Sequence, residues 1–167
     1  MTILSEASRS LIVFPDAETL VAGVSIVMKF MTARSFIDTN ILVYADDNAA
    51  PIKQGLAAEL IAEHRRGRTG VVSLQVLQEY FVVATRKLGV DPQTARRKVE
   101  LLAEFDVVTP EVPDILAAID LHRLHEFSFW DALILRSAKL GGCAVLLSED
   151  FQDGLRIEGL RIVNPFH

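Results

Sequence analysis

The chain has 167 residues, of which 50% are hydrophobic and 23% charged, a composition that predicts one globular domain and excludes a disordered chain. Its formal net charge of −5 and pI near 5.3 argue against a simple nucleic-acid-binding protein, which is usually basic, but not against carboxylates that bind cations. The single cysteine, Cys143, excludes an internal disulfide and is typical of a reducing compartment, so we expect a cytoplasmic protein.

The first 30 residues differ from the rest, because the regular pattern begins only after Met31. The stretch "MTARSFIDTN" would itself be a normal protein start. We therefore interpret residues 1–30 as an N-terminal extension, either an over-long translation start or an appendage that packs on the domain. Residues 10–14 are predicted as a strand and residues 17–30 as a short helix or strand. The most apolar stretch, 20–30, is too short to span a bilayer, and the N-terminus lacks a signal-peptide pattern.

From residue 35 onward, apolar strands alternate with helical segments. We expect strands at 35–38, 69–73, 106–110, 143–150 and 160–165, and helices at 39–45, 51–67, 74–89, 91–105, 112–127 and 128–142. Pro51 suits the first turn of its helix, while Asp91 and Pro92 form an N-cap and first helical position. The alternation predicts an α/β three-layer sandwich with a mainly parallel central sheet. The strands "GVVS" and "AVLL" are apolar throughout, as expected when helices cover both faces.

Acidic residues accompany the ends of the predicted strands. Ligands of such sheets bind outside the carboxyl ends of the strands. The first strand ends at Asp38, and the helix after the second strand carries Glu79 within two turns. The last long strand ends at Ser148 and is followed by Glu149 and Asp150, and the helix before it carries Asp131 in its first turn. We therefore expect four acids from four segments to converge on one rim of the sheet.

Two of these acids have an alternative structural explanation as helix caps. Asp38 or Thr39 could cap the helix predicted at 39–45. Asp131 follows Ser128 by three residues, an arrangement close to a capping box that also suits the helix dipole. Capping alone does not explain why an acid accompanies each apolar strand.

The other two acids differ in how readily a structural role explains them. Asp150 lies between Glu149 and Asp153, and the three could form an ordinary acidic turn before Gly154. Glu79 interrupts the apolar helix stretch "VLQEYFVV", so a solvated position explains it less well. Taken together, the positions favour a chemical site over four independent structural roles.

Converging carboxylates repel one another unless their pKa values rise or a cation binds between them. A set of oxygen ligands without a histidine or cysteine cluster suits Mg²⁺ or Mn²⁺ better than zinc. The four histidines show no metal-ligand spacing with a cysteine, and His122 and His125 suit a solvated helix face. Two hard cations can bind a phosphodiester and activate a water for in-line attack.

Four stretches carry a resemblance to a known family: "FIDTNILVYA", "LQEYF", "SFWDALILRSA" and "LLSEDFQDG". From about residue 35 to the C-terminus, the chain resembles the PIN-domain ribonucleases, and most closely the VapC-like toxins of bacterial toxin–antitoxin pairs. The resemblance implies a PIN-like nuclease domain over residues 31–167. Residues 1–30 have no counterpart in it.

The resemblance also implies which residues form the site. The catalytic, metal-binding acids of the family match Asp38, Glu79, Asp131 and Asp150, with Asp153 as a further candidate, and its supporting polar residues match Thr39, Asn40 and Ser148. The implied cofactor is Mg²⁺ or Mn²⁺, and the implied partners are an RNA substrate, a cognate antitoxin protein and a second copy in a homodimer. An apolar groove between the helices would suit a protein partner.

An RNA substrate requires positive charge near the rim. Arg86 follows Glu79 by seven residues on the same helix face and is our candidate phosphate contact. The runs 65–68 and 96–98 are alternatives, although both suit solvated helix ends. Aromatic residues near the acids could stack on bases or pack in the core; these are Tyr80, Phe81 and Trp130.

The sequence therefore predicts a metal-dependent endoribonuclease, the toxin of a toxin–antitoxin pair. One alternative is a catalytically silent PIN-like module that binds RNA or protein, although all four acidic positions are filled. Another is a different Mg²⁺-dependent phosphohydrolase of the haloacid-dehalogenase kind. That class needs a second aspartate two residues after Asp38, where Asn40 stands.

Overall fold

The structure is a computed structural model that describes residues 33–167. The strand and helix predicted within residues 1–30 lie outside the described residues. None of the described helices is long and apolar enough to cross a membrane.

Strands and helices follow the predicted order closely. The strands are β1 (Ser35–Ile37), β2 (Gly70–Ser73), β3 (Asp106–Val108), β4 (Val145–Leu147), β5 (Arg156–Ile157) and β6 (Leu160–Val163); the helices are α2 (Thr39–Tyr44), α3 (Pro51–Gly67), α4 (Leu74–Arg86), α5 (Pro92–Leu102), α6 (Val112–His125) and α7 (Phe129–Leu140). Helix α5 has the predicted cap, because the Asp91 side chain accepts hydrogen bonds from the amides of Gln93 and Thr94.

The structure shortens several predicted elements and adds one strand; for example, α5 ends at Leu102 rather than at residue 105. Helix α4 stops at Arg86 rather than at Gly89, which has a φ of +68° and so turns the chain out of the helix. The predicted strand 143–150 keeps only its central residues, β4, because the polar residues after it form a turn. Strand β5 was not predicted; it pairs antiparallel with β6 through a tight turn in which Glu158 and Gly159 both have positive φ.

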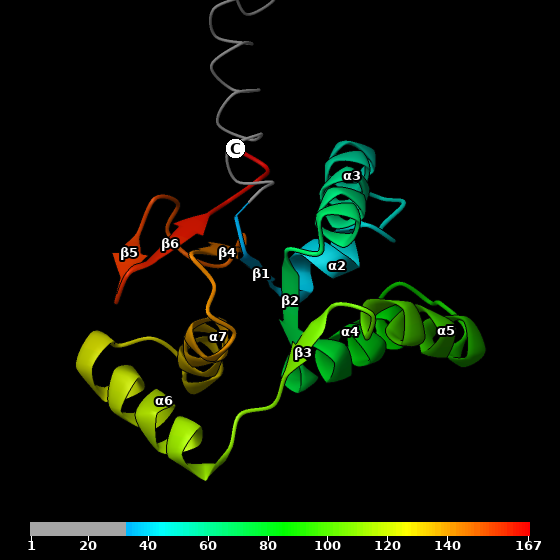
Figure 1. The fold of residues 1–167 in the computed structure, drawn as a ribbon. Helices are drawn as coiled ribbons and strands as arrows, with labels where there is room; N and C mark the ends of the chain where they lie inside the picture. The colour runs from blue at the N-terminus through cyan, green and yellow to red at the C-terminus, as the bar shows by residue number, and fades with distance from the viewer. Residues whose placement is uncertain (1–32) are drawn as a thin grey trace, which may run out of the picture.

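The sheet has six strands in the order β3-β2-β1-β4-β6-β5, and all neighbours except β5 and β6 are parallel. Helices α6 and α7 lie on one side of this sheet and helices α2 to α5 on the other (Figure 1). Strand residues such as Phe36, Val71 and Leu146 have no exposed surface, since helices cover both faces. The predicted three-layer α/β sandwich is confirmed.

The strand order changes direction between β1 and β4. The chain moves outward from β1 to β2 and β3, then returns through α6 and α7 to place β4 on the other side of β1. Such a topological switch point opens a crevice at the carboxyl ends of the two strands. The residues that follow Ile37 and Leu147 therefore occupy the position where ligands of this architecture bind.

Candidate active site

The ends of β1 and β4 bring Asp38 and Ser148 together. Ile37 is the register partner of Leu147, so the residues that follow them are neighbours. The Asp38 amide donates to the Leu147 carbonyl over 3.1 Å, and the Ser148 hydroxyl donates to Asp38 Oδ2 over 2.6 Å. Two of the predicted site residues thus meet at the switch point of the sheet.

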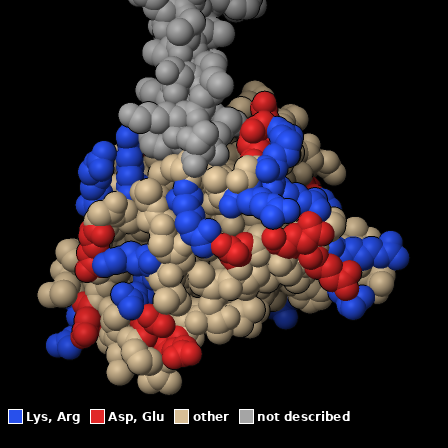
Figure 2. All heavy atoms as spheres, viewed as in Figure 1, with Lys and Arg blue, Asp and Glu red and all other residues tan. Residues whose placement is uncertain are grey.

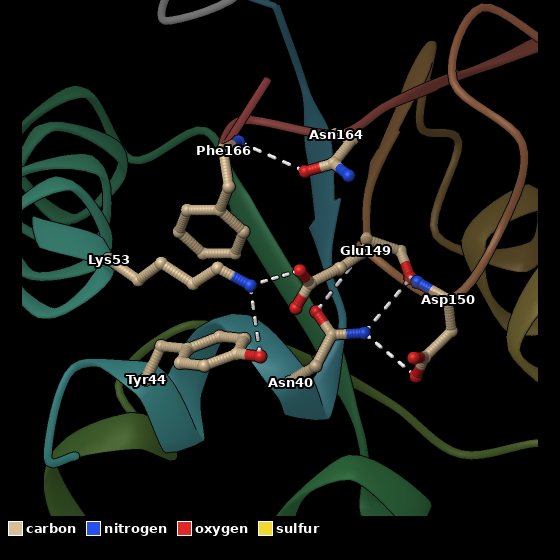
Figure 3. A network of polar contacts seen from close by, with 8 residues as sticks. Asn40, Tyr44, Lys53, Glu149, Asp150, Asn164 and Phe166 are labelled. Carbon is tan, nitrogen blue, oxygen red and sulfur yellow. Dashed lines mark hydrogen bonds and ion pairs between the residues drawn. The ribbon is translucent and has the colours of Figure 1, made fainter. Parts of the chain in front are cut away.

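Asn40, in the first turn of α2, connects this pair to the turn after β4 (Figure 3). Its Nδ2 donates to Asp150 Oδ2 over 2.9 Å and to Ser148 Oγ over 3.1 Å. Its Oδ1 accepts a hydrogen bond of 3.3 Å from the amide of Glu149. One amide side chain therefore fixes the carboxylate of Asp150 beside that of Asp38.

Glu79 joins the site through Thr39. The Thr39 hydroxyl donates to Glu79 Oε2 over 2.8 Å, and Gln75 Nε2 donates to Glu79 Oε1 over the same distance. Gln75 is buried and was not predicted to belong to the site. The signal for it is its spacing, four residues before Glu79 on α4, which places both side chains on one helix face.

Asp38 is both a cap and a buried carboxylate. Its Oδ1 accepts a 2.7 Å hydrogen bond from the amide of Thr39 at the start of α2, as the capping alternative predicts. Its side chain is nevertheless buried, and burial raises its pKa to about 6 against the hydrogen bonds from Ser148 and Thr39. The nearby charges of Asp150 and Glu79 raise this pKa further. The capping role is therefore confirmed, and the burial of the carboxylate is compatible with the predicted metal-binding role.

The structure places Asp131 and Asp153 differently from these three acids. Asp131 closes a capping arrangement at the start of α7, where Ser128 Oγ donates to its Oδ2 over 2.6 Å and accepts from its amide. Asp153 Oδ1 accepts a hydrogen bond from the amide of Asn164. Among residues 33–167, no hydrogen bond links either acid to Asp38.

The donor set still fits a hard divalent cation. Among the described residues, no group of three or more Asp, Glu, His or Cys side chains is drawn together tightly enough to hold a metal ion. Asp38, Glu79 and Asp150 are instead linked through Thr39 and Asn40, and no described lysine or arginine forms an ion pair with them. Carboxylate oxygens that lack a cationic partner are the ligands that Mg²⁺ and Mn²⁺ prefer.

A sequence model of the PIN domain family matches residues 35–152, which is more than half of the chain. The chain belongs to the PIN domain family. The resemblance drawn from the four sequence stretches is confirmed at this level, and the match contains every acid predicted to bind metal except Asp153. No curated protein sequence matches the chain.

Solved structures share the fold of this PIN domain. Mycobacterium tuberculosis VapC20, described as a sarcin-ricin loop cleaving toxin, matches with a TM-score of 0.58 and 21% identity over 70% of this chain and 91% of that chain. A chain of a toxin–antitoxin complex from Klebsiella pneumoniae matches with a TM-score of 0.58 and 21% identity over 78% of this chain and 97% of that chain. These matches establish a common fold with both proteins.

Basic side chains of the PIN domain are mostly paired with acids. Basic and acidic groups lie interspersed on the face shown in Figure 2, without a large patch of one sign. Arg65 pairs with Glu104, and Lys98 with Asp46. Arg86 is exposed at the end of α4 and forms no ion pair with the described residues, so its side chain is available to a phosphate.

The structure also separates the candidate basic and aromatic contacts. The run 65–68 precedes the amino end of β2 and thus lies at the edge of the sheet opposite Asp38. The side chain of Tyr80 is buried and its hydroxyl donates to Asp46, so Tyr80 is a core residue and not a stacking platform. Phe81 and Trp130 are 38% and 60% exposed and remain candidates.

Proposed function

We propose that this PIN domain is a metal-dependent endoribonuclease that hydrolyses RNA phosphodiester bonds. The observation that carries the proposal is the buried carboxylate of Asp38 at the switch point, with Asp150 and Glu79 held nearby and no cationic partner among the described residues. Such a site gains most from a bound cation, because the cation relieves the repulsion among the acids.

Asp38, Glu79, Asp131 and Asp150 would hold Mg²⁺ or Mn²⁺, with Asp153 as a further candidate. The metal would supply electrostatic stabilisation of the phosphoryl group and a water of lowered pKa. Thr39 and Gln75 orient Glu79, while Asn40 and Ser148 orient Asp38 and Asp150. Ser128 donates to Asp131 Oδ2, so Oδ1 of Asp131 would be the oxygen that binds the metal. Arg86 would bind a phosphate of the RNA.

We further propose that the protein is the toxin of a toxin–antitoxin pair in the cytoplasm. Two proteins that share its fold are a toxin and a member of a toxin–antitoxin complex. A groove of about 710 Å³ runs between α4 and α5 and would receive an apolar segment of the antitoxin. Its lining is mainly apolar, and Leu74 at one end directly follows the carboxyl end of β2. An antitoxin bound there would lie close to the proposed site.

A homodimer would use a different surface. Helix α6 is the outermost helix on its side of the sheet (Figure 1), and an apolar stripe runs along its exposed face. The α6 stripe consists of Val112, Ile115, Leu116 and Ile119, which are 68%, 37%, 57% and 38% exposed. The spacing of three and four residues is that of a seam between packed helices, and a two-fold axis would pair it with itself.

The experiment that tests the nuclease is a Mn²⁺ titration of RNA cleavage by the purified protein, with the variant Asp38→Asn and a small phosphate ester as a second substrate. We expect cleavage of RNA only with metal, its loss in Asp38→Asn, and no turnover of the ester. Metal-dependent turnover of the ester alone would favour the other phosphohydrolase. RNA binding without cleavage would favour the silent module.

A further inference from the structure

Two consecutive acids after β4 point to different partners (Figure 3). Asp150 accepts a hydrogen bond from Asn40 and belongs to the proposed metal site. The side chain of Glu149 extends toward α2 and α3, where it forms an ion pair with Lys53. Adjacent carboxylates in the sequence are therefore divided between the site and a separate cationic partner.

The position of Lys53 is defined by several contacts. Its Nζ donates to Glu149 Oε1 and to the Tyr44 hydroxyl, the latter over 3.2 Å. Nζ also lies 4.4 Å from the centroid of the Tyr44 ring and 5.2 Å from that of Phe166, within the range of cation–π contacts. Tyr44 and Phe166 pack edge to face with centroids 5.0 Å apart. Aromatic rings and a hydroxyl thus hold the ammonium group against Glu149.

Glu149 transmits this restraint to the proposed site through its backbone. Its amide donates to Asn40 Oδ1, and the same Asn40 donates to Ser148 and Asp150 on either side of it. The turn is therefore attached to α2 by Asn40 and to α3 by Lys53.

We propose that Lys53 is a positioning residue of the nuclease: by pairing with Glu149 it fixes the turn that carries Asp150 and keeps the Glu149 carboxylate away from the metal. The proposal rests on the proposed function. Without Lys53, the Glu149 carboxylate would lose its ion-pair partner while lying one residue from a proposed metal ligand. It would then compete with Asp150 for the ion and pull the turn away from Asn40.

Two simpler roles of Lys53 make different predictions. The side chains of Lys53 and Glu149 are 33% and 27% exposed, and ion pairs of such exposure contribute little to stability. A purely structural role would change the melting temperature alone. A direct contact with RNA phosphate would change the KM for RNA and the dependence of binding on salt. A positioning role changes the Mn²⁺ requirement and kcat.

The test compares Lys53→Met with Lys53→Arg and with a matched control, Lys139→Met. Lys139, in the last turn of α7, forms an ion pair with Glu158. Its side chain is 34% exposed, close to the 33% of Lys53. We expect Lys53→Met to lower kcat about tenfold and to raise the half-saturating Mn²⁺ concentration by about the same factor, as loss of a group that orients a ligand does. The KM for RNA should not change. Lys53→Arg should retain most activity and Lys139→Met all of it.

A changed KM with unchanged kcat and Mn²⁺ requirement would overturn the proposal in favour of phosphate binding. A lower melting temperature with normal kinetics would overturn it in favour of a structural role. If Lys53→Met does not fold, the exchanged pair Lys53→Glu with Glu149→Lys restores the ion pair and should recover activity; an inactive, folded exchanged pair also contradicts the proposal.

The outcome separates this inference from the proposed function. Wild-type protein that binds Mn²⁺ in calorimetry without cutting RNA would contradict the nuclease alone, and the Mn²⁺ affinity of Lys53→Met would still decide the positioning role. If the wild-type protein cuts RNA and the Lys53→Met variant has the same kcat and the same Mn²⁺ requirement, the positioning role alone would be contradicted. Wild-type protein that binds no Mn²⁺ would contradict both.

Discussion

The hydroxyl of Ser148 donates a 2.6 Å hydrogen bond to Oδ2 of Asp38, although 110 residues separate the two in the chain. The bond joins the carboxyl ends of β1 and β4 at the point where the strand order changes direction. Ser148 Oγ also accepts hydrogen bonds from Asn40 Nδ2 and from the amide of Asp150, each of 3.1 Å. Removal of this one oxygen therefore affects both acids.

Ser148→Ala should reduce both stability and cleavage. The hydrogen bond from Ser148 opposes the increase of the Asp38 pKa, so its loss should raise that pKa further. Above pH 6 we expect a loss of about 1–3 kcal/mol in the free energy of unfolding, because a buried carboxylate loses a donor. Thermal melts and RNA cleavage measure the two effects. Ser148→Thr keeps the hydroxyl and is the control, and equal activity of both variants would contradict the role of Ser148.

The stability of the metal-free protein should fall as pH rises through 6. The pKa of Asp38 is about 6 in the folded state against 3.8 ordinarily, so the folded state binds the proton more tightly. This contribution is fully present below pH 3.8 and is lost as pH rises through the folded pKa. At about 1.4 kcal/mol for each pKa unit, the loss amounts to about 3 kcal/mol.

Asp38→Asn isolates this effect from the other carboxyl groups. Its unfolding free energy should lack the decline between pH 4 and 7, so the difference between the wild-type and variant curves gives the contribution of Asp38. Added Mn²⁺ should stabilise the wild type and have little effect on Asp38→Asn, because a ligand stabilises in proportion to its affinity. Parallel pH curves and equal gains from Mn²⁺ would show that Asp38 is only a cap.

Arg86→Ala should weaken RNA binding and reduce its salt dependence by about one phosphate contact. Arg68 provides a matched control, since it is also exposed and forms no ion pair with the described residues. It lies at the opposite edge of the sheet, next to β2. Binding measured over a range of salt concentrations should therefore be unchanged in Arg68→Ala. If Arg68→Ala weakens RNA binding and Arg86→Ala does not, the RNA binds at the other edge of the sheet.

Leu116→Glu should convert the proposed homodimer into a monomer, because it places a charge in the middle of the apolar α6 stripe. Light scattering after size-exclusion chromatography measures the mass. Ile52→Glu is the control, since Ile52 on α3 is 81% exposed and lies outside the stripe. A wild-type protein that is monomeric at high concentration would contradict the proposed homodimer.

A chain that begins at Met31 should fold and cut RNA. Residues 33–167 contain the six-stranded sheet and every residue assigned to the site. Circular dichroism should therefore show a folded shortened chain, and its cleavage kinetics should agree with those of the full chain. An insoluble shortened chain would show that residues 1–30 cover apolar surface of the domain.

The sequence predicted most elements because local signals define them. Proline and aspartate mark the starts of α3 and α5, and apolar runs without alternation mark β2 and β4. Strand β5 was missed because two residues carry no periodic pattern, and it forms only through its pairing with β6. The sequence predicts that α4 extends to Gly89, because residues 87 and 88 continue the helical pattern. The helix ends earlier, at Arg86, and Gly89 adopts a left-handed conformation.

For the site, the sequence by itself determined which acids follow the strands and which family they resemble. It did not determine that the cap Asp38 is also a buried carboxylate near other acids, because a cap needs only local contacts whereas Ser148, Asp150 and Glu79 come from other segments. Gln75 and Lys53 were missed, since their partners are chosen by side-chain direction and, for Lys53, by a residue 96 positions away. The tertiary contact with Lys53 directs Glu149 away from the site, whereas the bond between Ser128 and Asp131 is local and follows from their spacing in the sequence. Sequence spacing specifies residues that share an element, but only the packing of separate elements decides which of their polar groups meet.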